Sequence, residues 1–541
     1  MLNGARVSRR AFLAGMVATG GMAAAACGGG GDGDGDGEEP STETPGAGET
    51  AVEGTPKAGG TIRLASATPV LSLDPHTTEG VTLAPNFYSY VVHVTDWQGT
   101  VGDLAETWEI VDELDWVFSL RGGVRFQDLA PVNGREVVAG DIVYSIDRLR
   151  NLPGAIEQWD EWTEKYEAPD DRTFTLRTKK PYGYLLMSLG SPLTAVVPRE
   201  AVEEFGDLES HALGSGPFML EKHGRDEGID VVRNPNYYRP EIPYVDGVST
   251  KVMPDDASIQ AAFRAGQLDV YNAGNKLQAD AVRDVSGVNV QSYLSRSYAV
   301  FELNGSRVEA FKDARVREAI DLALDRKGMI DKLNFGGAEL AGPVGPLWDS
   351  TLPADEVEAA YIRDVQKAKQ LLSEASIDDL SFKLSFASVG NWADRAAIIQ
   401  QNLADIGVTA DLQPGELGAW LSDLLAGNFE ATTYSHLPYL SDDIQLQSHH
   451  SLGWGRTEAG NRGVDDPEVD AMLEQIHETI DEEDRIDLAR DVQRKILARH
   501  GPVMVLFEPY GYWCARDRIK GYTPTAYGFG LYKYDYWIDE T

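Results

Sequence analysis

The chain has 541 residues, of which 42% are hydrophobic and 25% are charged, and its formal net charge is −38 at pH 7. Such acidity excludes nucleic acid and anionic headgroups as plausible ligands, because the surface repels both. Only two cysteines occur, Cys27 and Cys514, so the fold must depend on its apolar core rather than on a disulfide framework.

Residues 1–26 have the composition of a signal peptide. Three arginines precede an uncharged run at 11–26, as in a basic region followed by an apolar one. This run is shorter than the roughly 20 residues that a spanning helix needs. Residues 8–13 (SRRAFL) resemble the twin-arginine export motif, which implies a bacterial or archaeal exported chain.

The end of the signal peptide, Ala24-Ala25-Ala26-Cys27, resembles a lipobox. In that motif the cysteine is diacylated and becomes the mature N-terminus, so we expect an extracytoplasmic protein attached to the membrane through lipid at Cys27. Ala24 departs from the aliphatic residue, usually Leu, that the motif prefers. Plain Ala-x-Ala cleavage, which would release a soluble protein, therefore stays open as an alternative.

Residues 27–57 are rich in Gly, acids, Thr and Pro, which predicts a disordered tether. The spacing of a calcium-binding loop occurs within it, at Asp32, Asp34, Asp36, Gly37 and Glu43. A polyglycine run and two prolines surround these residues, where a calcium-binding helix pair would need helices. We interpret the match as a coincidence of low complexity.

After residue 57, short apolar runs alternate with amphipathic segments, which favours α/β layers. Strands are expected at 61–64, 116–120, 231–232, 298–303 and 503–507. Helices are expected at 314–324, 392–406 and 484–499, where apolar residues recur at helical spacing. In the first of these helices Asp313 is placed to cap the N-terminus, and Arg315, Arg317 and Glu318 are expected to face water.

Local catalytic motifs are missing from the sequence, which lacks G-x-S-x-G, H-E-x-x-H and a Walker loop. His436, His449 and His450 are the one histidine cluster worth weighing as metal ligands, but adjacent histidines on a strand point to opposite sides. Asp442 and Asp443 could be read as paired carboxylates of a glycosidase, although neighbouring acids are common in so acidic a chain. We therefore expect the protein to bind no metal or cofactor and to catalyse no reaction.

Several segments follow one another in a recognisable order. Residues 102–149 contain the pattern LA-x-x-W…W-x-F-x-LR-x-G-x-x-F, and 214–218 (GSGPF) precede 233–238 (RNPNYY). Residues 301–326 contain F-x-D-x-R-V-R-x-A, and related pieces stand at 368–375 and 395–408. Together they resemble the family 5 extracellular solute-binding proteins, the oligopeptide-, dipeptide- and nickel-binding type.

The resemblance implies an α/β fold of the two-lobed, type II periplasmic-binding-protein kind, with a subdomain inserted in the first lobe. The expected boundaries are 58–297 plus 508–541 for lobe one, about 96–210 for its inserted subdomain, and 298–507 for lobe two. The resemblance further implies capture of a solute, with peptide favoured, by hinge closure. The loaded protein then docks on an ABC permease whose ATPase subunits are other chains.

Many peptide binders of this family carry a Trp and, three residues on, an Asp that pairs with the α-ammonium of the peptide. His436 and Tyr439 stand at those positions here, so the expected carboxylate is missing, and Asp442 or Asp443 could replace it. We hypothesise that polar and aromatic residues of the resembling segments line the cleft: Asn304, Tyr434, His436, Tyr439, Asp442 and Trp454. A metal-chelate binder of the same family and a secreted hydrolase remain the alternatives.

Overall fold

The computed structural model describes residues 54–77, 80–94, 99–152, 158–436, 441–453, 460–522 and 535–539. Some predictions fall outside these ranges, namely the signal peptide at 1–26, the lipid site Cys27, the tether at 27–53, Tyr439 and Trp454. The described residues belong to one compact unit, Val52–Thr541.

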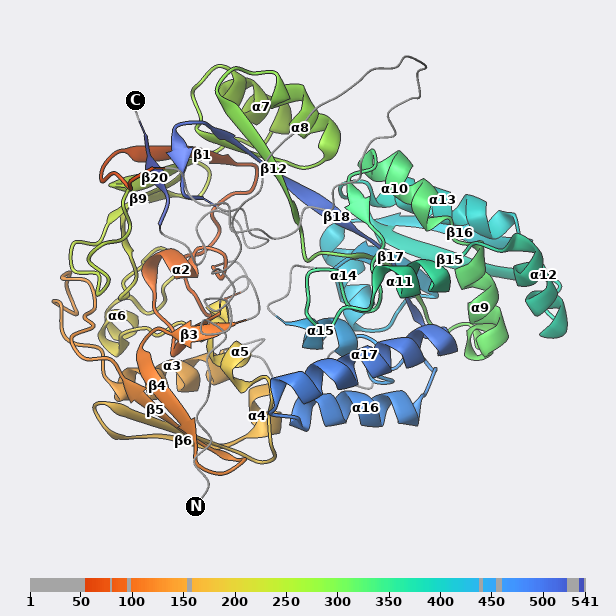
Figure 1. Ribbon diagram of the computed structural model, residues 1–541, viewed down its shortest axis with the longest axis horizontal. Helices are drawn as coiled ribbons and strands as arrows, with labels where there is room; N and C mark the ends of the chain where they lie inside the picture. The colour runs from red at the N-terminus through yellow and green to blue at the C-terminus, as the bar shows by residue number, and fades with distance from the viewer. Residues whose placement is uncertain are drawn as a thin grey trace, which may run out of the picture. The chain divides into compact units, whose positions relative to one another are not determined.

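Two four-stranded sheets are built from the first part of the described chain (Figure 1). One has the order β1-β10-β9-β8, with β1 parallel to β10, and consists of β1 (Thr61–Ser66), β10 (Gly247–Val252), β9 (Gly228–Arg233) and β8 (Phe218–Gly224). The other is antiparallel, with the order β4 (Ala105–Ile110), β5 (Asp115–Leu120), β7 (Thr173–Thr178) and β6 (Thr163–Asp170). Two short pairs accompany them, β2 (Val92–Val94) with β3 (Thr100–Gly102) and β19 (Ile519–Lys520) with β20 (Trp537–Ile538).

The longest strand, β18 (Val503–Arg516), belongs to the third large sheet. The order of this sheet is β11 (Val270–Ala273), β18, β13 (Ala299–Leu303), β17 (Ala431–Ser435), β15 (Leu380–Ala387) and β16 (Val408–Gly415), with β12 (Val288–Leu294) and β14 (Ala338–Glu339) also paired to β18. Strands β16 and β17 both run parallel to β15, so their carboxyl ends meet at one edge.

Helices connect and cover these sheets. Those of the first part are α2 (Ala84–Phe87), α3 (Ala139–Asn151), α4 (Gln158–Trp162), α5 (Leu185–Leu189), α6 (Arg199–Phe205), α7 (Asp256–Arg264) and α8 (Lys276–Arg283). Those that follow β13 are α9 (Ala314–Ala323), α10 (Arg326–Asn334), α11 (Ala354–Ala360), α12 (Val365–Glu374), α13 (Trp392–Ala404), α14 (Leu417–Leu425), α15 (Asp442–Gln447), α16 (Pro467–Glu478) and α17 (Glu482–Arg499). Two short 3-10 turns lie at Pro192–Thr194 and Glu309–Lys312.

The predicted strands and helices all occur, because apolar periodicity reflects which face is buried. Helix α9 begins after Asp313, whose side chain accepts a hydrogen bond from the Arg315 amide as the sequence predicted. Its apolar stripe packs in the core that surrounds β13 and β15. Helix α13 and helix α17 match the predicted ranges to within two residues.

The orientation predicted for Arg317 is wrong. Its side chain is buried, and Nε donates to the His500 carbonyl at 2.6 Å while Nη1 donates to the carbonyls of Phe311 and Lys312 at 2.9 and 2.8 Å. Arg317 therefore donates to backbone carbonyls of the 3-10 turn Glu309–Lys312 and of the residue that ends α17, a role that helical periodicity does not reveal.

Gly214 and Gly216 allow the close approach of two segments. A Cβ atom on Gly214 would lie 2.2 Å from the Phe87 carbonyl oxygen, and one on Gly216 would lie 2.5 Å from the Phe87 carbonyl carbon. The segment before β8 thus packs directly on the end of α2.

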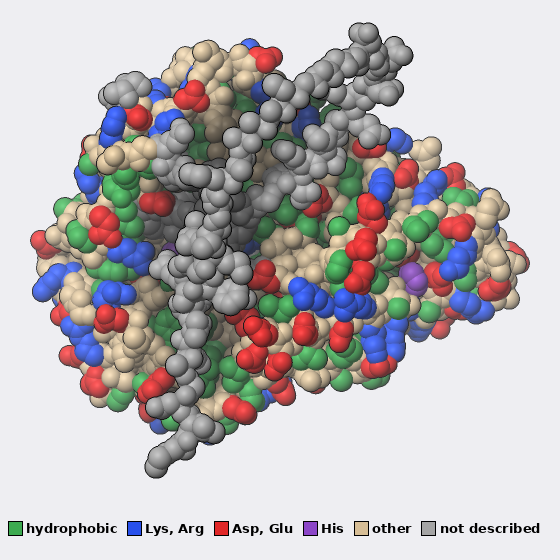
Figure 2. All heavy atoms as spheres, in the orientation of Figure 1, with side chains coloured by type: hydrophobic (Ala, Val, Ile, Leu, Met, Phe, Trp, Pro, Cys, Tyr) green, Lys and Arg blue, Asp and Glu red, His purple; other side chains and the backbone are tan. Residues whose placement is uncertain are grey.

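One face of the described chain carries side chains of both signs of charge. Acidic and basic side chains lie interspersed over the face turned to the viewer in Figure 2. None of the helices in the described ranges combines the length and the apolarity that are needed to span a bilayer.

Candidate functional site

Tyr434 and His436 lie at the carboxyl end of β17, beside the first residues of β13. The Tyr434 hydroxyl donates to Glu302 at 2.9 Å, and the Tyr434 and His436 rings lie 5.0 Å apart. The amide of His436 donates to the Tyr298 carbonyl at 3.0 Å, and the two rings are 4.7 Å apart. Burial lowers the pKa of His436 to about 3, with a further contribution from nearby His449, so His436 is neutral at physiological pH.

Asp442 begins α15 and joins two distant parts of the chain. It accepts hydrogen bonds from Ser350 Oγ and, at 3.1 Å, from the hydroxyl of Tyr184, which precedes α5. Desolvation is the main cause that raises its pKa, and the charge of Asp443 adds to this effect. Asp443 itself contacts His477 of α16.

Asn304 lies away from these residues, because Leu303 pairs with Ala431 at the opposite end of β17 from Ser435. It is buried, its Nδ2 donates to the Gly427 carbonyl at 3.2 Å, and its Oδ1 accepts from the Ser306 amide at 3.0 Å. The structure thus brings Tyr434 and His436 together at one edge and places Asn304 in a turn at the other.

Arg395, in the first turn of α13, was missed by the sequence reasoning. Only 1% of this residue is exposed, and its Nη1 donates to Ser435 Oγ at 3.0 Å. Its Nε and Nη2 have no hydrogen-bond partner within the described ranges. Burial alone lowers the pKa of Arg395 to about 9. A signal was present in the sequence, because Arg395 stands four residues before Ile399 on the apolar stripe of the predicted helix.

Glu508 lies where β18 changes partners. Strand β18 pairs with β13 through residues 503–507 and with β14, β12 and β11 from residue 508 onward. The buried Glu508 carboxylate accepts from the Arg296 amide at 2.7 Å through Oε1, whereas Oε2 has no hydrogen-bond partner among the described residues. Burial raises the pKa of Glu508 to about 7, and the charge of Glu339 acts in the same direction.

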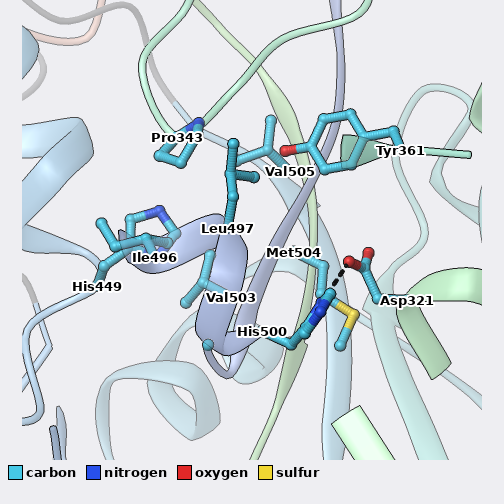
Figure 3. A pocket seen from close by; sticks show the side chains of 11 residues that line it. Asp321, Pro343, Tyr361, His449, Ile496, Leu497, His500, Val503, Met504 and Val505 are labelled. Atoms are coloured by element: carbon cyan, nitrogen blue, oxygen red, sulfur yellow. Dashed lines mark hydrogen bonds and ion pairs between the residues drawn. The ribbon is translucent and has the colours of Figure 1, made fainter. Parts of the chain in front are cut away.

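A small cavity lies beside the start of β18 (Figure 3). Its volume is about 20 Å³, which is room for about one water molecule and not for a peptide. Asp321 and His500 face each other in it, with Oδ2 and Nδ1 3.0 Å apart. His449 also lines the cavity, and burial lowers its pKa to about 4. Within the described ranges, acids, histidines and cysteines form no group of three that could hold a metal ion.

Residues 99–454 match the family described as bacterial extracellular solute-binding proteins, family 5 Middle. The chain belongs to this family. It is a substrate-binding protein of an ABC importer, and the resemblance inferred from its sequence is confirmed.

Among its relatives, this family 5 protein is 25% identical to the probable D,D-dipeptide-binding periplasmic protein DdpA of Escherichia coli over 456 residues, which cover 81% of this chain and 86% of the relative. It is also 25% identical to heme-binding protein A of Haemophilus influenzae, over 79% of this chain and 82% of the relative. The solved structure of the periplasmic binding protein DppA of Helicobacter pylori, in complex with the peptide STSA, superposes with a TM-score of 0.74 at 22% identity, over 89% of this chain and 98% of that one. The two-lobed periplasmic-binding fold predicted for this family 5 protein is thereby confirmed.

Proposed function

We propose that this family 5 protein captures a peptide between its two lobes and delivers it to a membrane permease. Family membership supports solute capture, and relatives named for dipeptides or solved with a peptide support the ligand class. The proposed cleft is lined by Tyr434, His436 and Asp442 among the described residues, with Asn304, Tyr439 and Trp454 as further candidates.

We place lobe one at residues 58–297 plus 508–541, with the inserted subdomain at about 96–210, and lobe two at 298–507. The observation that carries this division is the register of β18, which pairs with β13 up to Phe507 and with β12 from Tyr510. A strand that pairs with one set of strands along its first half and with another set along its second half provides a hinge crossing. Closure about it would follow from a ligand that binds the closed state more tightly than the open state.

We further propose that the chain is exported by the twin-arginine route and held at the outer side of a membrane by lipid on Cys27. The basic pair and the lipobox-like segment support both steps. Replacing Cys27 with Ser should release the protein from the membrane fraction of its own host and remove the mass of the lipid from its N-terminal peptide. Recovery of unmodified Cys27 or of a soluble wild-type protein would support plain cleavage instead.

Native mass spectrometry of protein purified from its own host tests the ligand class. A bound mass that fragments as a peptide, together with binding of tripeptides in calorimetry, is the expected result. A metal chelate bound at stoichiometric level would contradict the peptide proposal and support the alternative, a metal-chelate binder of the same family. Turnover of a bound peptide or glycoside would instead indicate a hydrolase.

A further inference from the structure

Arg395 presents an unfilled pair of hydrogen-bond donors inside lobe two. The Nε and Nη2 groups point from the same edge of the guanidinium and form the fork that binds a carboxylate through two parallel hydrogen bonds. These are the two nitrogens of Arg395 without partners in the described part of the chain, while Nη1 on the other edge is bonded to Ser435. The vacant donors are therefore the matching pair for a carboxylate.

The same fork is filled elsewhere in this protein. Arg63 donates through Nε and Nη2 to the two carboxylate oxygens of Asp269, at 3.0 and 2.8 Å. Arg135 holds Glu200 in the same manner, at 2.6 and 2.7 Å. Arg395 is more deeply buried than Arg63 and Arg135, and no acid among the described residues is paired with it. Burial of an unpaired cation costs free energy, which binding of an anionic group would offset.

The position of Arg395 is one where α/β sheets bind ligands. It follows β15 in the chain and contacts the last residue of β17, at the edge where the carboxyl ends of the parallel strands meet. Aromatic rings adjoin it, since its guanidinium lies 5.6 Å from the ring centre of Trp392, which in turn contacts Trp420, and Trp420 contacts Tyr434. An apolar wall with a few convergent polar groups is typical of a solute site.

We propose that Arg395 binds a carboxylate of the captured solute, so that this protein holds its ligand by an acidic end rather than by an amino end. The inference rests on the proposed capture of a solute between the lobes and adds the chemical class of the group that is recognised.

Three acids that could take an ammonium are poorly placed for it. Asp442 is already bonded to Ser350 and Tyr184, and Glu302 is bonded to Tyr434 and Arg462. Glu508 Oε2, which has no hydrogen-bond partner among the described residues, lies close to Gly345. A Cβ atom added to Gly345 would be only 2.3 Å from this oxygen, so there is no room for an ammonium between them. Compared with these acids, Arg395 retains hydrogen-bond donors, Nε and Nη2, that have no partner among the described residues.

The test compares three forms of each tripeptide in a small library: the free acid, the carboxyl-terminal amide and the Nα-acetylated acid. A thermal-shift screen selects the tripeptide whose free acid binds most tightly. Calorimetry then measures the dissociation constants of its three forms. Wild type should bind the acid and the acetylated acid similarly, and the amide about tenfold or more weakly, because the amide cannot accept two charge-assisted hydrogen bonds.

Three variants complete the experiment. Arg395→Met should bind acid and amide equally, and its ligand-free melting temperature should equal or exceed that of wild type, because a buried unpaired cation is removed. Arg395→Lys keeps the charge but not the fork, so most of the preference for the acid should be lost. Arg317→Met, the matched control with its carbonyl partners, should melt earlier yet keep the wild-type ratio of acid to amide affinity.

Equal binding of acid and amide by wild type would overturn the role of Arg395 while leaving peptide capture intact. An unchanged ratio in Arg395→Met would do the same. If no tripeptide binds in any form, both the peptide assignment and this inference are wrong.

Discussion

At the scale of single residues, buried arginines separate into two kinds. Arg317 donates to three backbone carbonyls, and Arg326 donates through Nε to the Val505 carbonyl at 2.8 Å and forms an ion pair with Asp321. Among the described residues, Arg395 has one hydrogen-bond acceptor, the neutral Ser435. Since a buried donor without a partner costs free energy, the first kind stabilises the fold and the second weakens it.

Replacement of Arg317 by Met should lower the free energy of unfolding by about 2–3 kcal/mol, because three carbonyls lose their donors in a buried site. Urea unfolding monitored by tryptophan fluorescence measures the loss. The matched exposed variant Arg315→Met, at the same helix end, should lose less than about 1 kcal/mol. Equal losses for the two variants would contradict the structural role of Arg317.

The raised pKa of Glu508 predicts that the free energy of unfolding depends on pH. Its pKa is raised to about 7 in the folded state from the ordinary value of 4.5, so the fold favours the protonated form. The stabilisation that comes from the protonated Glu508 is complete below pH 4.5 and is lost as the pH rises to 7. The reason is that Glu508 ionises at a lower pH in the unfolded chain than in the folded one. The maximum loss is about 3 kcal/mol.

Glu508→Gln imitates the protonated acid and should not lose stability over this range. The difference in unfolding free energy between wild type and this variant, measured from pH 4.5 to pH 8, should therefore grow as pH rises and level off above 7. A difference that is constant over the whole range would place the ionisation of Glu508 at an ordinary pKa.

The sequence could predict which helix faces are apolar but not which buried cation is paired. Arg317 adjoins the apolar stripe of α9 and Arg395 lies on that of α13, and both are buried. Their partners come from residues 311, 312, 500 and 435, so only the tertiary contacts distinguish a structural cation from one with unpaired donors.

At the scale of elements, local signals located β13, α9, α13 and α17, because burial, capping and spacing are encoded within a few residues. Strand β18 was predicted only to Phe507, whereas it continues to Arg516. Pro509 and Gly511 interrupt the apolar pattern there, and the extension depends on pairing with β12, more than 200 positions earlier in the chain. Pairing between distant segments has no local signature.

Close packing of the 214–216 segment on α2 gives a prediction for Gly214→Ala. The added Cβ would lie 2.2 Å from the Phe87 carbonyl oxygen and 2.5 Å from Tyr88 Cδ1, so backbone must move, and we expect a loss of about 2–3 kcal/mol in unfolding free energy.

The matched control is Gly140→Ala, within α3, where the added Cβ would lie 3.9 Å from Val138 Cγ2, an ordinary van der Waals distance. Alanine has the higher helix propensity, so this variant should be unchanged or more stable by up to about 1 kcal/mol. Urea unfolding of both variants gives the comparison. Equal stability of the two variants would show that the segment can move away from α2 without cost.

At the scale of the molecule, contacts join the segment before α5 to the elements of the proposed second lobe. The Gly183 amide donates to the His477 carbonyl at 2.7 Å, and the Tyr184 hydroxyl donates to Asp442 at 3.1 Å. The guanidinium of Arg485 lies 4.9 Å from the ring centre of Tyr184. No local pattern relates positions 184 and 442, so the two-lobed arrangement was predicted from the family resemblance and not from periodicity.

Because Tyr184 and Asp442 belong to different proposed lobes, their hydrogen bond should favour the closed state. Tyr184→Phe removes the donor and keeps the ring, so the closed state should lose about 1 kcal/mol, which shifts the ratio of closed to open molecules roughly fivefold. Small-angle scattering of the ligand-free variant should then give a larger radius of gyration than wild type, and solute affinity should also fall about fivefold.

Tyr166→Phe is the matched control. The Tyr166 hydroxyl donates to Asp147 within the proposed inserted subdomain, so its removal should leave the radius of gyration unchanged. Equal radii for all three proteins would indicate that the contact at Tyr184 persists in the open state and belongs to the hinge rather than to closure.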